Sequence, residues 1–218
     1  MALNKRRKMK KEKKRFLVTH SNPESVVSEQ FRTIRTNIHF INGKKKSSII
    51  LVTSPGKGEG KSTITANIAV SMAQQKEKVL LIDGAIRSPD IHSTFKMANQ
   101  VGLTDVLAGK ASFEEAVVSS KIGMLDILTG GTNPRNPAEL LASQSMVNLL
   151  ERVKPLYDII LIDSPPLLKL TDSKVMAHIC DGVVLVVKKN KTSLDSIFES
   201  KRVLEFANTQ IIGTVVND

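Results

Sequence analysis

The apolar positions of the chain follow two patterns that alternate along the sequence. Short runs of Val, Ile and Leu, each bounded by small or polar residues, indicate strands that are buried on both faces. Between most of these runs, apolar residues recur every three or four positions, which is typical of amphipathic helices. The strand segments are 48–54, 78–84, 125–131, 157–164, 181–189 and 211–217, and the helical segments are 24–41, 61–75, 137–153 and 192–207.

This alternation predicts an α/β fold, a doubly wound and mostly parallel sheet with helices between its strands. The 218 residues suffice for one such domain with a well-buried core. No internal repeat or long linker divides the sequence, so we expect a tail over residues 1–22 and a single domain over residues 23–218. In open α/β sheets the ligand lies beyond the carboxyl ends of the strands, which makes the residues at those ends the candidates for function.

Charge is concentrated at the start of the chain. The formal net charge is +11, and the first 16 residues hold nine Lys or Arg and one Glu. This basic tail is expected to be disordered in isolation and to suit an anionic membrane leaflet, although a solvated arm without a partner is the alternative. Aromatic residues make up only 4% of the chain, which argues against nucleic acid as a partner.

Two further classes of protein are disfavoured by the sequence. It has no apolar run of the roughly 18–20 residues that a membrane span needs, and no apolar core of a signal peptide near its start. The single cysteine, Cys180, excludes an intrachain disulfide and is expected to be a buried thiol. The one tyrosine, Tyr157, is expected to pack rather than to accept phosphate.

The clearest chemical motif, TSPGKGEGKST, follows the first strand segment and leads directly into a helix. A phosphate loop reads G-x-x-x-x-G-K-[ST], and here a proline replaces the first glycine while the final Gly-Lys-Ser fits. Its glycines let successive backbone N–H groups face an anion, to which the helix adds its positive end. We expect Lys61 to hold the β- and γ-phosphates of ATP and Ser62 to ligate Mg²⁺; the alternative is a glycine-rich turn without a ligand. The predicted nucleotide-binding residues of the loop are Pro55, Gly56, Lys57, Gly58, Glu59, Gly60, Lys61, Ser62 and Thr63.

Two other strand segments end in an aspartate, Asp83 in VLLIDGAIRSP and Asp163 in IILIDSPP. Beside a phosphate loop, carboxylates at these positions are expected to orient Mg²⁺. Each aspartate alone could be an ordinary strand end or cap. The chain closes on IIGTVVND, in which Asn217 could hydrogen-bond the adenine edge or simply form a turn.

These motifs, together with GGTNPRNPAELL over 130–141, resemble those of the bacterial tyrosine kinases of capsule and exopolysaccharide loci. The resemblance runs from about Pro23 to the last residue and is to the form in which a cytoplasmic kinase works with a separate membrane adaptor. It implies a P-loop NTPase-like fold and transfer of the γ-phosphoryl group of ATP to a protein tyrosine. It also implies catalytic roles for Lys61, Asp83 and Asp163, with Ser62 and both aspartates at the metal and Asp83 beside the acceptor hydroxyl.

The same resemblance implies two kinds of protein partner. The segment EQFRTIR places Glu29, Arg32 and Arg35 on one helix face, and it is similar to the E-x-x-R-x-x-R motif that joins subunits of this family into a ring. An amphipathic helix with ordinary surface charges is the alternative. The other implied partner is a transmembrane adaptor whose cytoplasmic tail completes the nucleotide pocket. The chain would then be cytoplasmic, at the inner face of the membrane.

The sequence departs from the family pattern at two places. Ala85 and Ser88 stand where the second acidic motif has its second aspartate and a basic residue, although Arg87 and Pro89 are kept. Since a positioned general base contributes roughly 10²–10⁴ in rate, we expect weak activity. The sequence also reaches Asp218 without the tyrosine-rich cluster and final helix of the family, which indicates either truncation or a member that does not autophosphorylate in the usual way.

Two other functions are compatible with these motifs. Switch ATPases of the partition or septum-positioning type share the fold, but they carry an early lysine in the phosphate loop where this chain has Gly56, with Lys57 one residue away. A scaffold that binds ATP and assembles without transferring phosphate is the third hypothesis, and Ala85 and the missing tyrosine-rich cluster motivate it.

Overall fold

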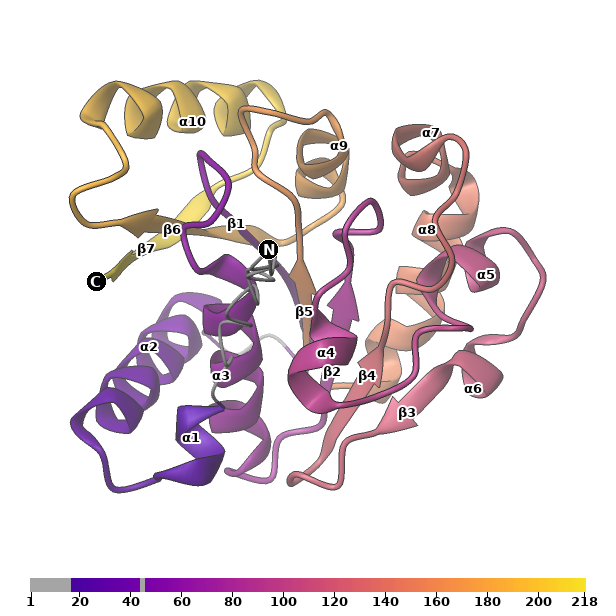
Figure 1. Cartoon of the computed structure of the whole chain (residues 1–218), viewed down its shortest axis with the longest axis horizontal. Helices are drawn as coiled ribbons and strands as arrows, with labels where there is room; N and C mark the ends of the chain where they lie inside the picture. Colours follow the sequence, from indigo (N-terminus) through magenta and orange to yellow (C-terminus); the bar gives the residue numbers. More distant parts are fainter. Residues whose placement is uncertain (1–16, 44–45) are drawn as a thin grey trace, which may run out of the picture.

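A single seven-stranded sheet organises the protein (Figure 1), whose computed structural model describes residues 17–43 and 46–218. The strands lie in the order β3-β4-β2-β5-β1-β6-β7, and all neighbours are parallel except β3 and β4. The predicted doubly wound, mostly parallel fold is confirmed, and β3 is an addition that no predicted segment contained. The strands are β1 (Ser48–Thr53), β2 (Val79–Asp83), β3 (Val117–Ser119), β4 (Leu125–Leu128), β5 (Ile159–Asp163), β6 (Gly182–Lys188) and β7 (Ile211–Asn217).

Helices cover both faces of the sheet because alternate residues of the central strands point to opposite sides. Ile50 and Val52 of β1 belong to the apolar cluster with α2 and α3, whereas Ile49 and Leu51 belong to the cluster with α5 to α10. Figure 1 shows α1, α2 and α3 grouped apart from α5 to α8. The helices are α1 (Val18–Ser21), α2 (Val26–Asn42), α3 (Lys61–Ala73), α4 (Ile91–Phe95), α5 (Leu103–Leu107), α6 (Phe113–Ala116), α7 (Pro137–Leu141), α8 (Gln144–Val153), α9 (Asp172–His178) and α10 (Leu194–Phe206), with a 3₁₀ turn over Lys154–Leu156.

The helix predicted over residues 137–153 is interrupted in the structure. Ser143 has an extended backbone, with φ −71° and ψ 156°, and its hydroxyl donates a 2.7 Å hydrogen bond to the carbonyl of Leu140. A serine that bonds the backbone locally competes with the helical ladder, so α7 ends and α8 begins around this residue. The short helix α9 was also absent from the predicted segments.

The first described residues belong to the folded body. The tail prediction covers residues 1–22, of which 1–16 lie outside the described residues. Over 17–22 the structure differs from it, because α1 packs against α3: the backbone N–H and the hydroxyl of the buried Thr19 donate to Oδ1 of Asn67 at 3.1 and 2.9 Å. The side-chain amide of Gln74 donates to the carbonyl of Thr19 at 3.1 Å. These polar contacts thus order a segment that the sequence analysis had grouped with the basic tail.

Within the described ranges, none of the helices combines the length and the apolar character that crossing a bilayer requires.

Replacing Asn67 with Ala should detach α1 from α3 and lower the free energy of unfolding by about 2 kcal/mol, because two donors of Thr19 lose their buried acceptor. Denaturant unfolding measures the loss, and limited proteolysis detects release of α1. Asn148→Ala on the exposed side of α8 is the control, with an expected change within about 0.5 kcal/mol. Equal unfolding midpoints for the two variants would contradict the anchoring of α1 by Asn67.

Candidate active site

The predicted phosphate loop lies between β1 and α3, at the carboxyl end of the sheet. Gly58 and Gly60 have left-handed φ angles of 75° and 91°, which side chains other than glycine rarely adopt. A Cβ atom on Gly60 would also lie 2.2 Å from Nδ2 of Asn217. The last turn of the loop therefore needs glycine for both its backbone angle and its space, and α3 begins immediately afterwards at Lys61.

The side chain of Glu59 holds the phosphate loop in place. Its side chain is buried, and Oε2 accepts a 2.7 Å hydrogen bond from the backbone N–H of Gly56. Oε1 accepts a hydrogen bond from the hydroxyl of Thr192, whose oxygen in turn accepts one from the backbone N–H of Lys188 at 2.9 Å. Glu59 thus ties the loop to the end of β6. In this structure Glu59 stabilises the loop, and no pattern in the sequence indicated its partner Thr192.

Asn217, the predicted adenine-binding residue, also holds the loop. Its side-chain amide donates to the backbone carbonyl of Glu59 at 2.9 Å, while its backbone carbonyl accepts a hydrogen bond from the backbone N–H of Lys189. The ammonium group of Lys191 donates to the carbonyl of Lys57. Asn217 lines the cavity described below as well, so its predicted contact with a base stays a prediction.

The two predicted acidic residues are brought side by side. Asp83 and Asp163 are register partners at the ends of β2 and β5, and both are fully buried. The backbone N–H of Gly84 donates to the carbonyl of Asp163 at 2.8 Å, which fastens the two strand ends together. The two aspartates nevertheless have very different hydrogen-bond environments.

Asp83 uses its carboxylate to fix the loop that follows β2. Oδ2 accepts from the backbone N–H groups of Asp90 and Ile91 at 2.8 and 2.9 Å, and Oδ1 accepts from that of Ala85 at 3.2 Å. Burial raises the pKa of Asp83, and these three hydrogen bonds act against the rise. This carboxylate holds the backbone on either side of the motif that contains Ala85, and its predicted metal role stays a prediction.

Asp163 has a carboxylate oxygen with no partner. Oδ1 accepts a 3.3 Å hydrogen bond from the hydroxyl of Thr65 on α3, whereas the buried Oδ2 has no hydrogen-bond partner among the described residues. Burial raises the pKa of Asp163 to about 7; the charge of Lys61 and a hydrogen bond with Ser62 lower it, and the charge of Asp83 raises it.

The arrangement around Asp163 fits a magnesium site. A buried carboxylate oxygen without a donor gains from a cation, and the predicted ligand Ser62 and Lys61 of the phosphate loop lie next to it. In the described part of the chain, no three or more His, Cys, Asp or Glu side chains cluster as a complete metal site. The donor set therefore suits Mg²⁺, which keeps several waters and shares phosphate oxygens, better than an all-protein cage.

A cavity of about 780 Å³ opens in front of the phosphate loop. Its apolar wall comes from Val18 and Phe31, and its cationic groups come from several loops. The predicted site residues that line it are Lys57, Gly58, Gly60, Lys61, Ser62, Thr63 and Asn217; Pro55, Gly56, Glu59, Asp83 and Asp163 do not line it. Lining residues that the sequence did not single out include Val18, Val27, Phe31, Asn67, Asp90, Lys169 and Lys188.

Arg87, kept from the family motif, is locked beside this cavity. Its Nε and Nη2 atoms donate to the two carboxylate oxygens of Asp172 at 2.8 and 3.0 Å, and Asp172 is fully buried at the start of α9. Hydrogen bonding with Asp172 raises the pKa of Arg87 further. A bidentate pair of this kind fixes the guanidinium plane. Asp172 lies beyond the IILIDSPP motif, in a stretch where the sequence analysis found no motif, so the sequence did not indicate it.

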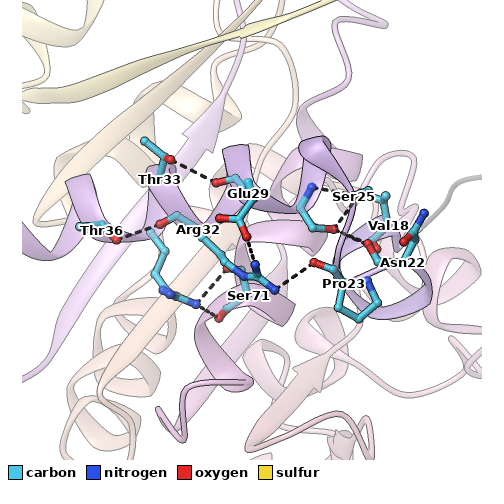
Figure 2. Close-up of polar contacts among 11 residues, drawn as sticks. Val18, Asn22, Pro23, Ser25, Glu29, Arg32, Thr33, Thr36 and Ser71 are labelled. Carbon is cyan, nitrogen blue, oxygen red and sulfur yellow. Dashed lines mark hydrogen bonds and ion pairs between the residues drawn. The ribbon is translucent and has the colours of Figure 1, made fainter.

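The predicted oligomerisation residues lie on α2, and both arginines have partners within the chain (Figure 2). Arg32 pairs with Glu29 and donates to the carbonyl of Pro23 at 2.9 Å. Arg35 donates to the carbonyl of Ser71 at 2.7 Å, where the last turn of α3 has carbonyls without helical donors. Glu29 and Arg32 are thus available at the surface as a pair, while Arg35 stabilises the packing of α2 on α3.

Two curated relatives match nearly the whole chain. Tyrosine-protein kinase YwqD of Bacillus subtilis is 42% identical over 217 residues, which span 100% of this chain and 91% of YwqD. Putative tyrosine-protein kinase CapB of Staphylococcus aureus is 36% identical over 201 residues, spanning 92% of this chain and 88% of CapB.

Two solved structures resemble the chain to different degrees. The chimerical protein CapA2B2 superposes with a TM-score of 0.88 at 36% identity, over 92% of this chain and 88% of that one. The septum site-determining protein MinD of Pyrococcus horikoshii, complexed with Mg-ADP, reaches a TM-score of 0.69 at 27% identity, over 78% of this chain and 70% of MinD. By both identity and TM-score, the similarity to CapA2B2 is greater than that to MinD.

The family model of the AAA domain matches residues 47–211, which run from the start of β1 to the start of β7. This range contains the phosphate loop and both aspartates at the strand ends. This match, together with the two kinases that align with almost the whole chain, shows to which family the chain belongs. The chain belongs to the bacterial tyrosine-kinase family and carries that family's AAA domain.

Proposed function

We propose that this chain is an ATP-dependent protein-tyrosine kinase that regulates capsular or exopolysaccharide biosynthesis. The observation that carries the proposal is the glycine loop in front of Asp163, whose buried Oδ2 has no partner among the described residues. The names of YwqD and CapB support the choice of tyrosine as acceptor. The link to polysaccharide rests on the motif resemblance described above.

The cavity's own groups supply the electrostatics that such a transfer needs. Lys61 and the N-terminal N–H groups of α3 would hold the phosphates of ATP, with Ser62 and Asp163 positioned to hold Mg²⁺. The bound ion supplies positive charge at the phosphate oxygens. Because the reaction needs little covalent chemistry from the protein, placing these charges in a partly enclosed cavity accounts for most of the catalysis.

Ala85 limits what this site achieves. Its side chain is 7% exposed at the cavity wall and offers no oxygen, in a motif where the family has a second aspartate. We therefore propose a kinase of low activity, and an ATP-binding scaffold is the alternative that the same residue favours. A septum-type switch is disfavoured by Gly56, because that position holds no lysine and its N–H is bound to Glu59.

Two partners belong to the proposal. A transmembrane adaptor of a polysaccharide export system would hold the chain at the cytoplasmic face of the membrane, aided by the basic tail. A second copy of the chain would meet the Glu29–Arg32 pair, whose members are exposed enough to exchange partners, in a homo-oligomeric ring. The charge distribution outside the first 16 residues gives no support for nucleic acid.

Replacing Lys61 with Met should reduce phosphotyrosine formation at least about a hundredfold, because a cation that stabilises the transferred phosphoryl group is lost. The assay combines the full chain, ATP, Mg²⁺, a candidate adaptor tail and a tyrosine-bearing substrate protein, with phosphotyrosine as the readout. Lys201→Met on the exposed side of α10 is the control and should leave the rate unchanged. Absence of phosphotyrosine above the K61M background would refute the kinase proposal.

Replacing Asp163 with Asn should stabilise the free protein while abolishing Mg²⁺-dependent ATP binding. The pKa of Asp163 is raised from 3.8 to about 7 by burial, so the folded state keeps its proton between these values and the free energy of unfolding falls as pH rises through that window. The melting temperature of D163N should exceed that of the natural chain by several degrees at pH 8, and the gap should shrink at pH 5. Melting curves at both pH values test this, with Asp195→Asn as control; a D163N variant that melts lower at pH 8 contradicts it.

Replacing Arg32 with Ala should lower the solution mass to that of the monomer, because the exchangeable Glu29–Arg32 pair is broken. Its free energy of unfolding should change by less than about 0.5 kcal/mol, since the pair is exposed. Arg35→Ala should instead cost about 1–2 kcal/mol, because the carbonyl of Ser71 loses its donor. Light scattering and denaturant unfolding separate the two effects, with Arg202→Ala as control. An R32A variant whose solution mass equals that of the natural chain would show that the Glu29–Arg32 pair is not part of the interface.

A further inference from the structure

The side chain of Lys191 binds the middle of the phosphate loop. Lys191 belongs to the turn between β6 and α10, where its backbone N–H donates to the carbonyl of Lys188 at 3.1 Å. Its ammonium group donates to the backbone carbonyl of Lys57, and a Cβ atom on Gly58 would lie 3.1 Å from the same nitrogen. Lys191 therefore holds the peptide unit that joins Lys57 to Gly58, and it is not one of the residues that line the cavity in front of the loop.

Asn217 makes the equivalent contact two residues further along the loop. Its side-chain amide donates to the backbone carbonyl of Glu59 at 2.9 Å, and a Cβ atom on Gly60 would overlap the same nitrogen. The end of β7, which carries Asn217, pairs with the end of β6, and the backbone carbonyl of Asn217 accepts from the N–H of Lys189 at 2.9 Å. The side chains of Asn217 and Lys191 thus reach the loop from neighbouring places, the end of β7 and the turn after β6.

These two contacts fix the direction of two backbone N–H groups. No described peptide bond is cis, and in a planar trans peptide unit the carbonyl and the following N–H point in opposite directions. Holding the carbonyl of Lys57 therefore directs the N–H of Gly58 to the other side of the loop, and holding that of Glu59 does the same for Gly60. Neither N–H has an acceptor among the described residues, and both glycines line the cavity.

The N–H of Gly56 serves a different purpose, because it donates to Oε2 of Glu59 at 2.7 Å. The N–H groups that the loop can offer to an anion thus include those of Gly58 and Gly60, to which the start of α3 at Lys61 adds its own. Backbone N–H groups of a phosphate loop cradle the α- and β-phosphates of a nucleotide. Donors that already point at the ligand need no reorganisation when it arrives, so holding them in place strengthens binding.

We propose that Lys191 and Asn217 are positioning residues for the nucleotide, which aim the N–H groups of Gly58 and Gly60 at its phosphates. This role rests on the proposed binding of ATP. It gives Asn217 a different part from the adenine contact predicted from the sequence, because the amide then serves the phosphates of any nucleotide. Loss of either side chain should therefore weaken the binding of phosphates and leave the choice of base unchanged.

Four variants of the full chain test these roles: Asn217→Ala, Lys191→Met and two controls, Asn148→Ala and Lys189→Met. Lys189 is the matched control for charge, because it is exposed two residues away and its ammonium group pairs with Asp218. Lys191 is itself exposed, so Lys191→Met tests the proposal even where Asn217→Ala lowers the melting temperature.

The affinities of each variant for ATP, GTP and inorganic tripolyphosphate are measured by titration calorimetry at fixed free Mg²⁺, with the melting temperature as the test of folding. Asn217→Ala and Lys191→Met should each weaken the binding of all three by about three- to tenfold, since one hydrogen bond that shapes the cradle is lost. The ratio of ATP to GTP affinity should stay within about twofold of its natural value, because the base is not involved. Both controls should bind all three ligands within about twofold of the natural chain.

The outcomes separate positioning from base recognition and from charge. An Asn217→Ala variant that binds ATP less tightly, but GTP and tripolyphosphate as well as the natural chain, overturns the positioning role and assigns Asn217 to adenine. Natural affinities for all three ligands in both variants also overturn the proposal. A Lys189→Met variant that weakens binding as much as Lys191→Met overturns the role of Lys191, because the loss then follows net charge.

Phosphotyrosine formation is measured separately on the same proteins. A natural chain that binds ATP and loses affinity in both variants as expected, but forms no phosphotyrosine, supports this inference and ends the kinase proposal. A natural chain without affinity for ATP ends both.

Discussion

The site depends on one buried carboxylate, that of Asp83. It lies at the end of β2, with no exposed surface, and accepts three backbone N–H groups from the loop that follows. An ionised carboxylate at such depth is costly unless donors surround it, so the loop is held in the one arrangement that supplies them. That arrangement sets the backbone positions of Ala85 and Asp90, and the chain between them carries Arg87 to its buried partner Asp172.

The neighbouring Asp163 is an equally buried carboxylate with fewer hydrogen-bond donors around it. It shares the register position of Asp83 one strand away, but one of its oxygens has no donor within the described chain, and its pKa is raised to about 7. A group in that condition weakens the free protein at neutral pH and is relieved by a cation. Stability and ligand binding are therefore opposed at Asp163, whereas the carboxylate of Asp83 stabilises the loop that follows β2.

The phosphate loop is similarly held by hydrogen bonds to its backbone. Glu59 and Asn217 make these bonds, and Thr192 connects Glu59 to the end of β6. With these contacts in place, the N–H groups of the loop and the start of α3 need little rearrangement to receive phosphate, which is the condition for strong electrostatic catalysis. Two residues predicted as nucleotide ligands, Glu59 and Asn217, thus contribute in this structure by shaping the loop.

Local patterns of spacing and residue type were enough to predict the alternation of strands and helices, the glycine loop with Lys61 and Ser62, and the two aspartates at strand ends. Such patterns could not show that the predicted 137–153 helix breaks at Ser143, where one hydroxyl competes with the helical hydrogen bonds, or that residues 17–22 pack through Asn67. The difference between the two aspartates at the strand ends comes from tertiary contacts. Asp83 and Asp163 are alike as residues and are register partners, but the loop after β2 supplies backbone donors to Asp83, whereas one oxygen of Asp163 has no donor within the described chain.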